Sequence, residues 1–583
     1  MANIYRNIYC GNVSKNEIGK EVRIAGWVGS IRNLGSLSFI TVRDETGIVQ
    51  VISEDSSMLN DLTRESTVSI TGTVRARTDD MVNKNMKTGE IEIVLKTIDV
   101  LGKCASVLPF EINHSKDSTE DTRLKYRYLD LRRRKLTNNL ITRHKITMAV
   151  RNFLDNERFL EVETPVLCKS TPEGARDYLV PSRVNKGKFY ALPQSPQIFK
   201  QLLMVGGIER YFQIAKCFRD EDLRSDRQPE FTQVDIEMSF VDQEDVMDLT
   251  ERLVASVFKE VKGIDIKLPL MKMKYDDAMD KYGSDKPDLR FEMPICNITE
   301  IFKNTSFSVF KNVIDEGGII NCLVVKDAAS QYSRKGLDQL TEFVKTYKAS
   351  GLAYLKFEDE VSGSIAKVVS EEELNKLKEM LKIEKNDLLL IVADKKYSIV
   401  KTSLGALRCK LGRDLGLIKK DDYKLLWVVE FPSFEYSEEE GRYVACHHPF
   451  TAPLDSDVDK LISDKEHCYS KAYDIVINGY EAGGGSIRIH KEEVQEKMFR
   501  ALELSEEDIK NKFGFFVEAL KYGTPPHGGL ALGLDRLTML LSGTDNIREV
   551  IAFPKTASAS CLMSECPNTV SDKQLDELGI KVK

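Results

Sequence analysis

Five short runs of alternating apolar and polar residues occupy the first hundred residues and limit what this part of the chain can fold into. The runs cover residues 21–28, 37–43, 48–52, 68–74 and 91–95. Turn-forming residues separate them, as in Asn33-Leu34-Gly35. Alternation with a period of two is typical of strands that bury one face. Five such strands predict a small closed barrel, with the oligonucleotide-binding (OB) barrel as the leading candidate and another small β domain as the alternative.

The rest of the chain is too long to form one domain. A length of 583 residues exceeds what a single hydrophobic core supports. We predict the barrel over residues 1–103 and a hinge or linker over 104–137. Two halves of one domain are expected over 138–285 and over 421–583, the second with a C-terminal extension. A segment of mixed strands and helices, 286–420, separates them and is predicted to be an α+β insertion.

Composition and the lack of targeting signals indicate a cytoplasmic protein with no membrane partner. The chain contains no run of eighteen apolar residues and starts without a secretory signal pattern. Its eleven cysteines are scattered and include no Cys-x-x-Cys, which favours reduced thiols over a structural zinc site. The net charge of -7 argues against a dedicated nucleic-acid coat protein, but it allows a local basic surface.

A basic stretch lies at the end of the predicted linker. Seven of the thirteen residues from 123 to 135 are Lys or Arg, and Tyr126 and Tyr128 lie among them. Basic residues interleaved with aromatic ones can contact nucleic acid between two domains. A solvated helix face explains the same pattern, and the sequence leaves both interpretations open.

Two arginines about three hundred residues apart point to a triphosphate. Arg219 lies in Phe218-Arg219-Asp220-Glu221 and Arg536 ends Gly533-Leu534-Asp535-Arg536, while the chain has no phosphate-binding P-loop. The guanidinium group is always charged and presents a planar fork of donors that matches phosphate oxygens. Two such groups would hold a bent triphosphate and expose its α-phosphorus. For Arg219, a surface salt bridge to Asp220 or Glu221 is the alternative.

In motif order the chain resembles class II aminoacyl-tRNA synthetases, and in particular the bacterial type of aspartyl-tRNA synthetase, over nearly its full length. The matching motifs include Tyr128-Leu129-Asp130-Leu131-Arg132, Gln194-Ser195-Pro196-Gln197, Phe218-Arg219-Asp220-Glu221-Asp222, Arg227-Gln228-Pro229-Glu230-Phe231-Thr232-Gln233, His447-His448-Pro449-Phe450-Thr451, Gly483-Gly484-Gly485-Ser486-Ile487-Arg488 and Gly529-Leu530-Ala531-Leu532-Gly533-Leu534-Asp535-Arg536. The resemblance implies a multidomain α+β fold: an OB-type barrel, a catalytic domain with an antiparallel sheet, and an inserted GAD-like domain. A parallel doubly wound sheet is thereby disfavoured.

For ATP, the resemblance implies that Arg219 contacts the α-phosphate and Arg536 the γ-phosphate. Glu221 and Gln228 would face the adenosine part, and Arg219, Glu221 and Arg536 form the implied catalytic set. The full implied ATP-binding set is Arg219, Asp220, Glu221, Gln228, Glu481, Gly533, Leu534, Asp535 and Arg536. Asp474 and Glu481 would hold Mg²⁺, which accepts a few carboxylates together with phosphate oxygens and water.

For aspartate, the resemblance implies that Lys200 and Arg488 meet the side-chain carboxylate. The remaining implied contacts are Glu173, Gln197, Arg219, Gln233, Asp235 and His447. Of these, His447 would close over the pocket. Asparagine would leave the two cations unpaired, at an expected cost of about 3 to 5 kcal/mol. For His447 and His448, a metal pair and an ordinary surface pair are the alternatives.

For tRNA, the resemblance implies that Arg32, Phe39 and Gln50 contact the anticodon. Phe39 could stack on a splayed base and Gln50 could hydrogen-bond a base edge. From its own surroundings, Phe39 is predicted to lie in the core, because Leu37 and Thr41 share its face.

The expected reaction is activation of L-aspartate by ATP and transfer to tRNA(Asp), catalysed by a homodimer. An enzyme that charges both tRNA(Asp) and tRNA(Asn), and an asparaginyl or lysyl relative, are the alternatives. Leu34 favours strict tRNA(Asp) specificity, whereas the neighbouring Asn33 departs from the family pattern. Arg158 also departs, because it stands where the family usually has glycine.

Overall fold

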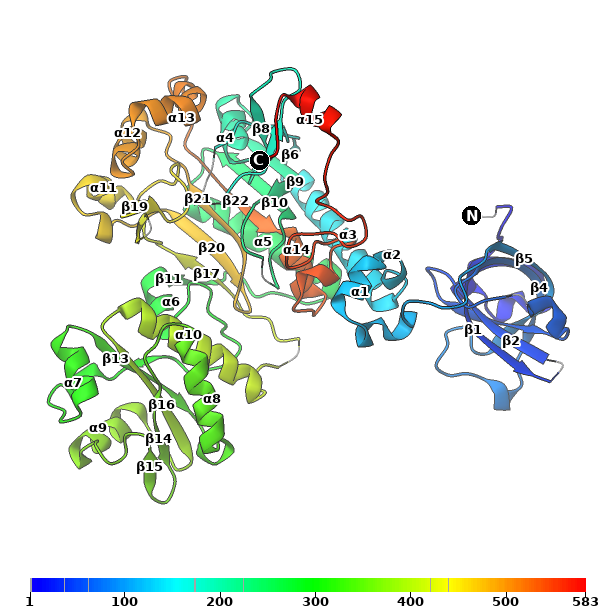
Figure 1. Ribbon diagram of the computed structural model, residues 1–583, viewed down its shortest axis with the longest axis horizontal. Helices are drawn as coiled ribbons and strands as arrows, with labels where there is room; N and C mark the ends of the chain where they lie inside the picture. Colours follow the sequence, from blue (N-terminus) through cyan, green and yellow to red (C-terminus); the bar gives the residue numbers. More distant parts are fainter. Residues whose placement is uncertain are drawn as a thin grey trace. The chain divides into compact units, whose positions relative to one another are not determined.

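The chain forms two compact units, Met1–Ser118 and Thr119–Lys583. The computed structural model describes residues 3–35, 37–60, 62–171, 175–223, 225–419, 421–438 and 440–583 (Figure 1). All eleven cysteines are free thiols. No helix among the described residues is long and apolar enough to cross a membrane.

The smaller unit is a closed five-stranded barrel, as the alternating pattern predicted. Its strands follow the order β1-β2-β3-β5-β4. Their bounds are β1 Glu21–Leu34, β2 Leu37–Arg43, β3 Ile48–Ser53, β4 Thr67–Ala76 and β5 Ile91–Gly102. Antiparallel pairing of β1 with β4 closes the barrel. Alternate residues such as Ile24, Val42 and Ile70 fill its interior, so that every second side chain is left on the outer surface.

The larger unit is built on an eight-stranded sheet with the order β11-β17-β20-β21-β22-β10-β9-β6. The strands are β6 Leu160–Glu161, β9 Arg210–Phe218, β10 Glu230–Ser239, β11 Met271–Lys274, β17 Leu425–Val429, β20 Ala472–Ile477, β21 Tyr480–Ile487 and β22 His527–Gly533. Neighbours pair antiparallel except at the two edges, where β11–β17 and β6–β9 are parallel. This arrangement confirms the antiparallel catalytic sheet.

One face of this sheet is covered by three helices. These are α3 Arg134–Asn156, α5 Gln243–Lys262 and α14 Leu534–Leu541. Their apolar residues, such as Val150, Leu253 and Leu537, share one core with Val234 and Leu530 of the sheet. Further helices of the unit are α4 Gln197–Val205, α6 Tyr275–Tyr282, α12 Glu492–Ala501, α13 Glu506–Leu520 and α15 Asp572–Leu578. With one face closed in this way, polar residues on the other face are free to line a site.

Three successive glycines in β21 let its neighbours approach closely. A Cβ added to Gly485 would lie 2.0 Å from the carbonyl oxygen of Gly529 on β22. A Cβ on Gly484 would lie 2.3 Å from Oδ1 of Asp474 on β20. Glycine weakens a strand in isolation, so these residues are explained by the groups crowded against them.

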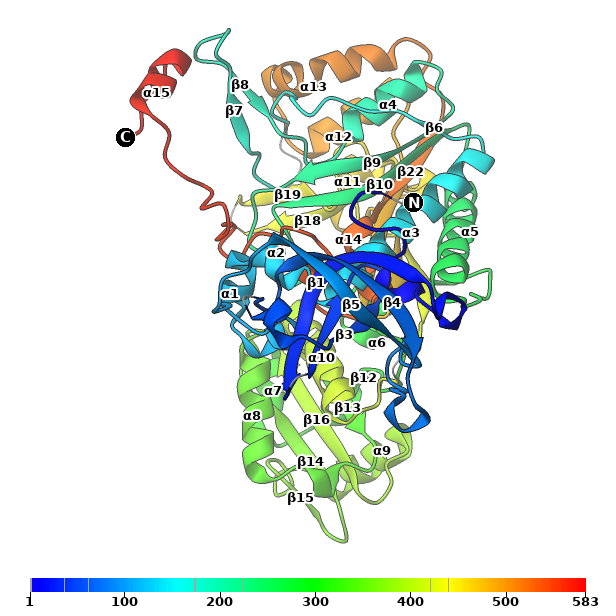
Figure 2. The same cartoon turned by 90° about the vertical axis from the view of Figure 1, so that its right-hand side faces the viewer.

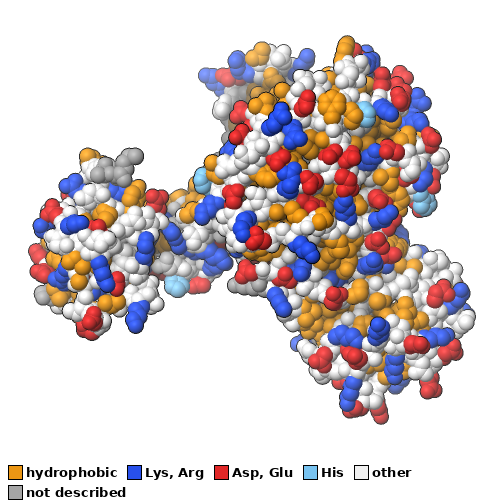
Figure 3. All heavy atoms as spheres, turned by 180° about the vertical axis from the view of Figure 1, so that it is seen from behind, with side chains coloured by type: hydrophobic (Ala, Val, Ile, Leu, Met, Phe, Trp, Pro, Cys, Tyr) orange, Lys and Arg blue, Asp and Glu red, His pale blue; other side chains and the backbone are white. Residues whose placement is uncertain are grey.

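Two short hairpins extend from the larger unit. The first consists of β7 Leu179–Pro181 and β8 Phe189–Ala191, and the second of β18 Phe434–Ser437 and β19 Arg442–Ala445. The β7–β8 hairpin lies near α15 (Figures 1 and 2), where Gly579 packs close to Lys186. On the face of the larger unit shown in Figure 3, basic and acidic side chains are interspersed.

The segment between the two halves of the large sheet forms a sheet of its own. Its strands are ordered β12-β13-β16-β14-β15, with bounds β12 Cys296–Asn297, β13 Ile319–Val325, β14 Ala353–Phe357, β15 Val361–Gly363 and β16 Asp387–Asp394. Helices α8 Arg334–Lys345 and α10 Tyr397–Asp414 pack on one face, and α7 Ser308–Asp315 and α9 Glu371–Leu381 on the other (Figure 1). The mixture of strands and helices agrees with the α+β character that the sequence pattern predicted for this segment.

Helix α10 also attaches this segment to the rest of the unit. It crosses the end of α6 where Gly405 meets Gly283, and a Cβ on Gly405 would lie 2.6 Å from the Gly283 carbonyl oxygen. The Lys401 ammonium is buried beside this crossing and lies 2.9 Å from Asp280 of α6. Close backbone contact and the ion pair of the buried Lys401 ammonium with the exposed Asp280 together fix α10 on α6.

Three of the seven basic side chains of this stretch, those of Arg123, Arg127 and Arg133, point into the larger unit instead of into solvent. It forms α1 Glu120–Lys125, α2 Arg127–Asp130 and the start of α3. Arg127 is buried and donates to the carbonyl oxygens of residues 548, 551 and 552. Arg123 and Arg133 pair with Glu549 at 2.9 and 2.8 Å. Both interpretations of the stretch are wrong for these three arginines, which connect the start of the unit to its C-terminal part.

Arg158 adopts the backbone conformation that its usual glycine would favour. Its φ of +66° lies in the left-handed region, which costs a residue with a Cβ about 1 to 2 kcal/mol. The turn between α3 and β6 therefore places Arg158 in a conformation that glycine would adopt without this cost.

Glu549→Gln tests the inward-folded arginines. Burial alone would raise the pKa of Glu549, but hydrogen bonds from Arg123 and Arg133 lower it to about 2. A lowered pKa means that the carboxylate stabilises the fold above the unfolded value of 4.5, and that this contribution is lost as pH falls toward 2. We expect the variant to lose about 3 kcal/mol at pH 7, and less as pH falls from 4.5.

The measurement is urea unfolding of wild type and variant at pH 7, 4 and 3. Glu577→Gln, at an exposed glutamate of α15, is the matched control and should leave the midpoint unchanged. A difference between wild type and E549Q that stays constant with pH would show that the carboxylate charge is not what matters.

Candidate functional site

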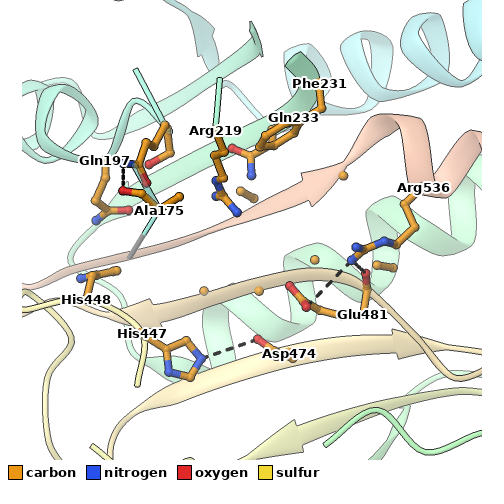
Figure 4. Close-up of a pocket in the computed structure, with 18 of the residues that line it drawn as sticks. Ala175, Gln197, Arg219, Phe231, Gln233, His447, His448, Asp474, Glu481 and Arg536 are labelled. Atoms are coloured by element: carbon orange, nitrogen blue, oxygen red, sulfur yellow. Dashed lines mark hydrogen bonds and ion pairs between the residues drawn. The ribbon is translucent and has the colours of Figure 1, made fainter. Parts of the chain in front are cut away.

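A cavity of about 610 Å³ opens on the sheet face that the helices leave uncovered (Figure 4). The predicted residues that line it are Gln197, Lys200, Arg219, Glu221, Gln228, Gln233, Asp235, His447, Asp474, Glu481, Arg488, Gly533, Asp535 and Arg536. Residues from distant parts of the sequence therefore meet at one site. Glu173 lies outside the described residues. Leu534 is buried in the core instead, and Asp220 lies beside Arg176, 3.6 Å away.

Arg219 follows the end of β9 and places its guanidinium in the cavity (Figure 4). The group lies 5.0 Å from the ring centroid of Phe231, a cation–π contact that orients it. The salt-bridge alternative is wrong, because Glu221 pairs with Arg227 at 3.1 Å and Asp220 with Arg176. Among the described residues the guanidinium has no ion pair, so its charge is available to an anion.

Arg536 reaches the cavity from α14 and is partly neutralised. Its Nη2 lies 3.1 Å from Asp226, a residue that the sequence motifs did not single out. Its Nη1 donates to the carbonyl oxygen of Glu481 and lies 3.9 Å from the carboxylate of that residue. Its Nε is buried and has no hydrogen-bond partner among the described residues. The Arg536 side chain is thus held in place by its Nη1 and Nη2 contacts, while its Nε donor is not used by any described residue.

Asp535, next to Arg536, stabilises the site from behind. Its carboxylate accepts the backbone N–H of Thr232 on β10 at 2.7 Å and pairs with Arg143 of α3. These contacts join β10, α3 and α14. The observed contacts of Asp535 therefore give it a structural role.

Asp474 and Glu481 place two carboxylates over Gly484. An ideal Cβ on that glycine would lie 2.3 Å from Asp474 Oδ1 and 3.7 Å from Glu481 Oε1. Burial, together with the negative charge of Glu481 and of Asp285, raises the pKa of Asp474 well above its usual range. Neighbouring like charges are destabilising unless a cation joins them, and here Asp474 is buried while 41% of the Glu481 side chain is exposed. No group of three or more metal-ligating side chains occurs in the described residues, so a cation here would need further ligands.

The aspartate candidates form a buried ion network at the end of the cavity. Lys200 Nζ lies 2.6 Å from Asp235 and 3.3 Å from Glu237. Arg488 donates to both oxygens of Glu237, through Nε at 2.9 Å and Nη2 at 3.0 Å. All four side chains are at most 2% exposed. The two cations are therefore already paired, and the expectation that asparagine would leave them unpaired is wrong.

The two acids of this network respond differently to burial. Burial raises the pKa of Asp235, and Lys200 only partly opposes it. Burial also acts on Glu237, but Arg488 and Lys200 together outweigh it and lower the pKa of this carboxyl. Glu237 is thus held ionised. It was missed from the sequence, although it follows Asp235 by two residues on β10 and must share its face.

Two polar atoms in this region lack hydrogen-bond partners among the described residues. They are Oδ2 of Asp235, an acceptor, and Nε2 of Gln197, a donor. Buried groups of this kind are nearly always satisfied in a working structure. Their presence beside the ion network indicates a ligand that offers both a hydrogen-bond donor and a hydrogen-bond acceptor.

His447 and His448 are neutral at pH 7. Burial, with the positive charge of Arg488, lowers the pKa of His447 to about 4 and that of His448 well below its usual range. His448 Nε2 lies 2.9 Å from Arg488 Nη1, and His447 lies 4.0 Å from Asp474 (Figure 4). The pair faces the cavity, which excludes the surface alternative.

The remaining glutamines are held by neighbours. Gln228 accepts the backbone N–H of Lys555 at 2.7 Å and donates to its carbonyl oxygen at 3.1 Å. Gln233 accepts from the thiol of Cys217 at 3.3 Å. Gln228 therefore joins the C-terminal segment to the wall of the cavity.

In the smaller unit, the three anticodon candidates lie on the outer surface of the barrel. Arg32 is paired with Phe39 across β1 and β2, and Gln50 pairs with the next outward residue of β2, Thr41. Phe39 is half-buried, while its neighbours Ser38 and Ile40 face the interior, so the prediction that Phe39 lies in the core is wrong. Gln50 donates to Glu92 at 3.0 Å.

Comparisons with known proteins agree with this geometry. Residues 119–557 match the family of class II tRNA synthetases (D, K and N), and residues 22–101 match the OB-fold nucleic acid binding domain. An aspartate–tRNA ligase of Geobacillus kaustophilus is 56% identical over 99% of both chains. An aspartate–tRNA(Asp/Asn) ligase of Geobacillus sp. WCH70 is also 56% identical, over 99% of this chain and 98% of the relative.

A solved structure of similar fold is the asparaginyl-tRNA synthetase of Pyrococcus horikoshii complexed with asparaginyl-adenylate. Its TM-score is 0.58 at 18% identity, covering 95% of this chain and 99% of the other. The chain belongs to the class II tRNA synthetases of the D, K and N group.

Proposed function

We propose that this protein is an aspartate–tRNA ligase, which makes aspartyl-adenylate from ATP and L-aspartate and then transfers the aspartyl group to tRNA(Asp). The observation that carries the proposal is the buried network of Lys200, Asp235, Glu237 and Arg488 at the cavity that Arg219 also lines, where the Arg219 guanidinium has no ion pair with any described residue. Relatives with this name are more than half identical along nearly the whole chain.

Within this site, aspartate would bind with its ammonium group at Oδ2 of Asp235, which has no hydrogen-bond partner among the described residues, and with its side-chain carboxylate at Lys200 and Arg488. Lys200 and Arg488 can offer a ligand only N–H donors, because Lys and Arg side chains have no acceptor. An aspartate carboxylate accepts from both, whereas the amide of asparagine would turn its own N–H groups toward one of them. A buried donor left unsatisfied costs about 1 to 3 kcal/mol, or roughly 5- to 150-fold in discrimination.

ATP would lie between Arg219 and Arg536. The aspartate α-carboxylate is ionised at neutral pH and attacks the α-phosphorus without a general base. Arg219 neutralises charge on the α-phosphate and positions the attacking carboxylate, while Arg536 holds the leaving pyrophosphate. Asp474 and Glu481 fit Mg²⁺, because a cation would join their neighbouring carboxylates and triphosphate oxygens would complete the ligand set. When bound, Mg²⁺ supplies further neutralisation of phosphate charge.

The outer barrel surface with Arg32, Phe39 and Gln50 would contact the anticodon of tRNA(Asp). A half-exposed aromatic ring beside a cation suits an unstacked base and its phosphate. The chain is proposed to act in the cytoplasm and to be strict for tRNA(Asp), with an enzyme that also charges tRNA(Asn) as the second candidate, because relatives carry both names.

We further propose a homodimer formed through α3 and the chain around β6. Large apolar side chains are exposed there, namely Ile141, Met148, Leu160, Val166 and Leu167. Strand β6 is also a free edge of the eight-stranded sheet, and edges with apolar neighbours are usually covered.

Lys200→Met and Arg536→Ala should separate the two substrates. Losing the Lys200 charge-assisted contact should lower kcat/KM for aspartate about 100- to 1000-fold and change the KM for ATP by less than about threefold. Losing Arg536 should raise the KM for ATP about 10- to 100-fold with a small effect on aspartate. ATP–pyrophosphate exchange measures both.

Lys216→Met, at an exposed position on β9, is the matched control and should behave as wild type. Thermal unfolding of all variants shows whether the fold is retained. Equal losses for both substrates in a folded Lys200→Met variant would mean that the proposed roles are misassigned.

Charging of purified tRNA(Asp) and tRNA(Asn) should distinguish strict from relaxed specificity. We expect aspartylation of tRNA(Asp) to exceed that of tRNA(Asn) by at least about 100-fold, the size of one or two lost base contacts. Phe39→Ala should slow charging of tRNA(Asp) while leaving ATP–pyrophosphate exchange unchanged. Comparable rates on the two acceptors would establish the relaxed alternative.

A further inference from the structure

Two cysteines face each other across neighbouring strands of the insertion, and neither of them lines the cavity. Cys296 of β12 is paired with Cys322 of β13 in antiparallel register, and Figure 2 shows the two strands side by side. Paired residues in such a ladder have Cα atoms about 4.5 to 5.5 Å apart. This separation lies inside the range of about 4.4 to 6.8 Å that a disulfide requires.

The two side chains are in contact and differ in accessibility. Both belong to the core that α7 and α9 cover, and the Cys296 thiol donates to the Pro294 carbonyl oxygen at 3.8 Å. Cys322 is completely buried among the apolar residues of α7 and α9, whereas Cys296 is half-buried at the edge of the sheet. Only one of the two sulfurs can therefore meet a reagent from solution.

The same geometry sets their reactivity apart. The hydrogen bond from Cys322, with a smaller contribution from the Lys401 ammonium, lowers the pKa of Cys296 to about 7 against the opposing effect of burial. Burial raises the pKa of Cys322 well above its usual range. An accessible thiolate next to a protonated thiol is the arrangement of an attacking and a resolving cysteine.

We propose that Cys296 and Cys322 form a thiol-modification site that reacts with low-molecular-weight disulfides and closes into a reversible intramolecular disulfide. The Cys296 thiolate attacks one sulfur of R–S–S–R, and the released R–S⁻ takes up a proton. Cys322 then gives up its proton and attacks the Cys296 sulfur, releasing the second R–S⁻, which is protonated. The two protein thiols are oxidised, and one small disulfide is reduced to two thiols.

The site lies where the insertion joins the rest of the larger unit. The residue before Cys296, Ile295, donates its N–H to the carbonyl oxygen of Lys281 in α6 at 2.8 Å. Lys401, whose charge favours the Cys296 thiolate, pairs with Asp280 of the same helix. A disulfide here would covalently tie the first strand of the insertion to the next strand of its sheet.

A second facing pair, Cys561 and Cys566, provides an internal comparison. These residues also form an antiparallel bridge, but the hydroxyl of Ser564 hydrogen-bonds both sulfurs. The hydrogen bond from Ser564 contributes to a lowered pKa of Cys561. We therefore expect this pair to react with small disulfides as well, independently of Cys296 and Cys322.

The test is treatment of the full chain with 2-hydroxyethyl disulfide at pH 7, followed by alkylation and peptide mapping without reductant. The expected product links Cys296 to Cys322, whether or not Cys561 and Cys566 are linked as well. Cys296 should also be alkylated about three- to fivefold faster than Cys168, whose pKa burial raises, because a larger thiolate fraction outweighs lower nucleophilicity.

Variants separate the two steps. Cys322→Ala should trap the mixed disulfide on Cys296, Cys296→Ser should abolish the link, and Cys561→Ser should leave it unchanged. Cys322 is in the core, so Cys322→Ala can fail to fold. In that case the peptide map of the wild-type protein decides the question. A wild-type protein in which Cys296 stays free, or in which the mixed disulfide persists unresolved, would overturn the proposal.

Discussion

The bidentate pair between Arg488 and Glu237 organises the substrate end of the cavity. Glu237 lies on β10 and Arg488 follows β21, so the pair spans the centre of the sheet. Without Glu237 the guanidinium would be a buried charge without a partner, at a cost of about 3 to 5 kcal/mol. With Glu237 in place, Arg488 and Lys200 are rigidly oriented before any substrate arrives, which is the condition for selective binding.

The backbone around this pair is adapted to it. A Cβ on Gly529, which is paired with Glu237 across β10 and β22, would lie 2.1 Å from Oε2 of that residue. Gly484 similarly leaves room for Asp474. The glycines thus allow the carboxylates of the ion network and of the acid pair to lie directly over neighbouring strands. One strand arrangement therefore positions the groups for both proposed substrates, aspartate and magnesium–ATP.

Local patterns in the sequence predicted much of the fold, because period-two alternation is a property of single strands. The positions of the barrel strands follow from this alternation. It does not show which of the two alternating sets of residues in β2 is buried, and so it misplaced Phe39. Leu37 and Thr41 share the face of Phe39, yet the buried side is formed by Ser38, Ile40 and Val42. Arg123 and Arg133 show a second limit, since their orientation depends on Glu549, more than four hundred residues away. The site residues were recognisable from motifs, whereas their pairing with Glu237 and Asp226 depends on contacts between distant strands.

The central claim is that a preformed, charge-compensated pocket selects aspartate. ATP–pyrophosphate exchange by the wild-type protein with aspartate, asparagine and lysine measures it most directly. We expect kcat/KM for aspartate to exceed that for asparagine by roughly 5- to 150-fold, because the amide N–H groups of asparagine would face the N–H donors of Lys200 or Arg488. Lysine should give no exchange. Exchange with asparagine or lysine as fast as with aspartate would contradict the claim.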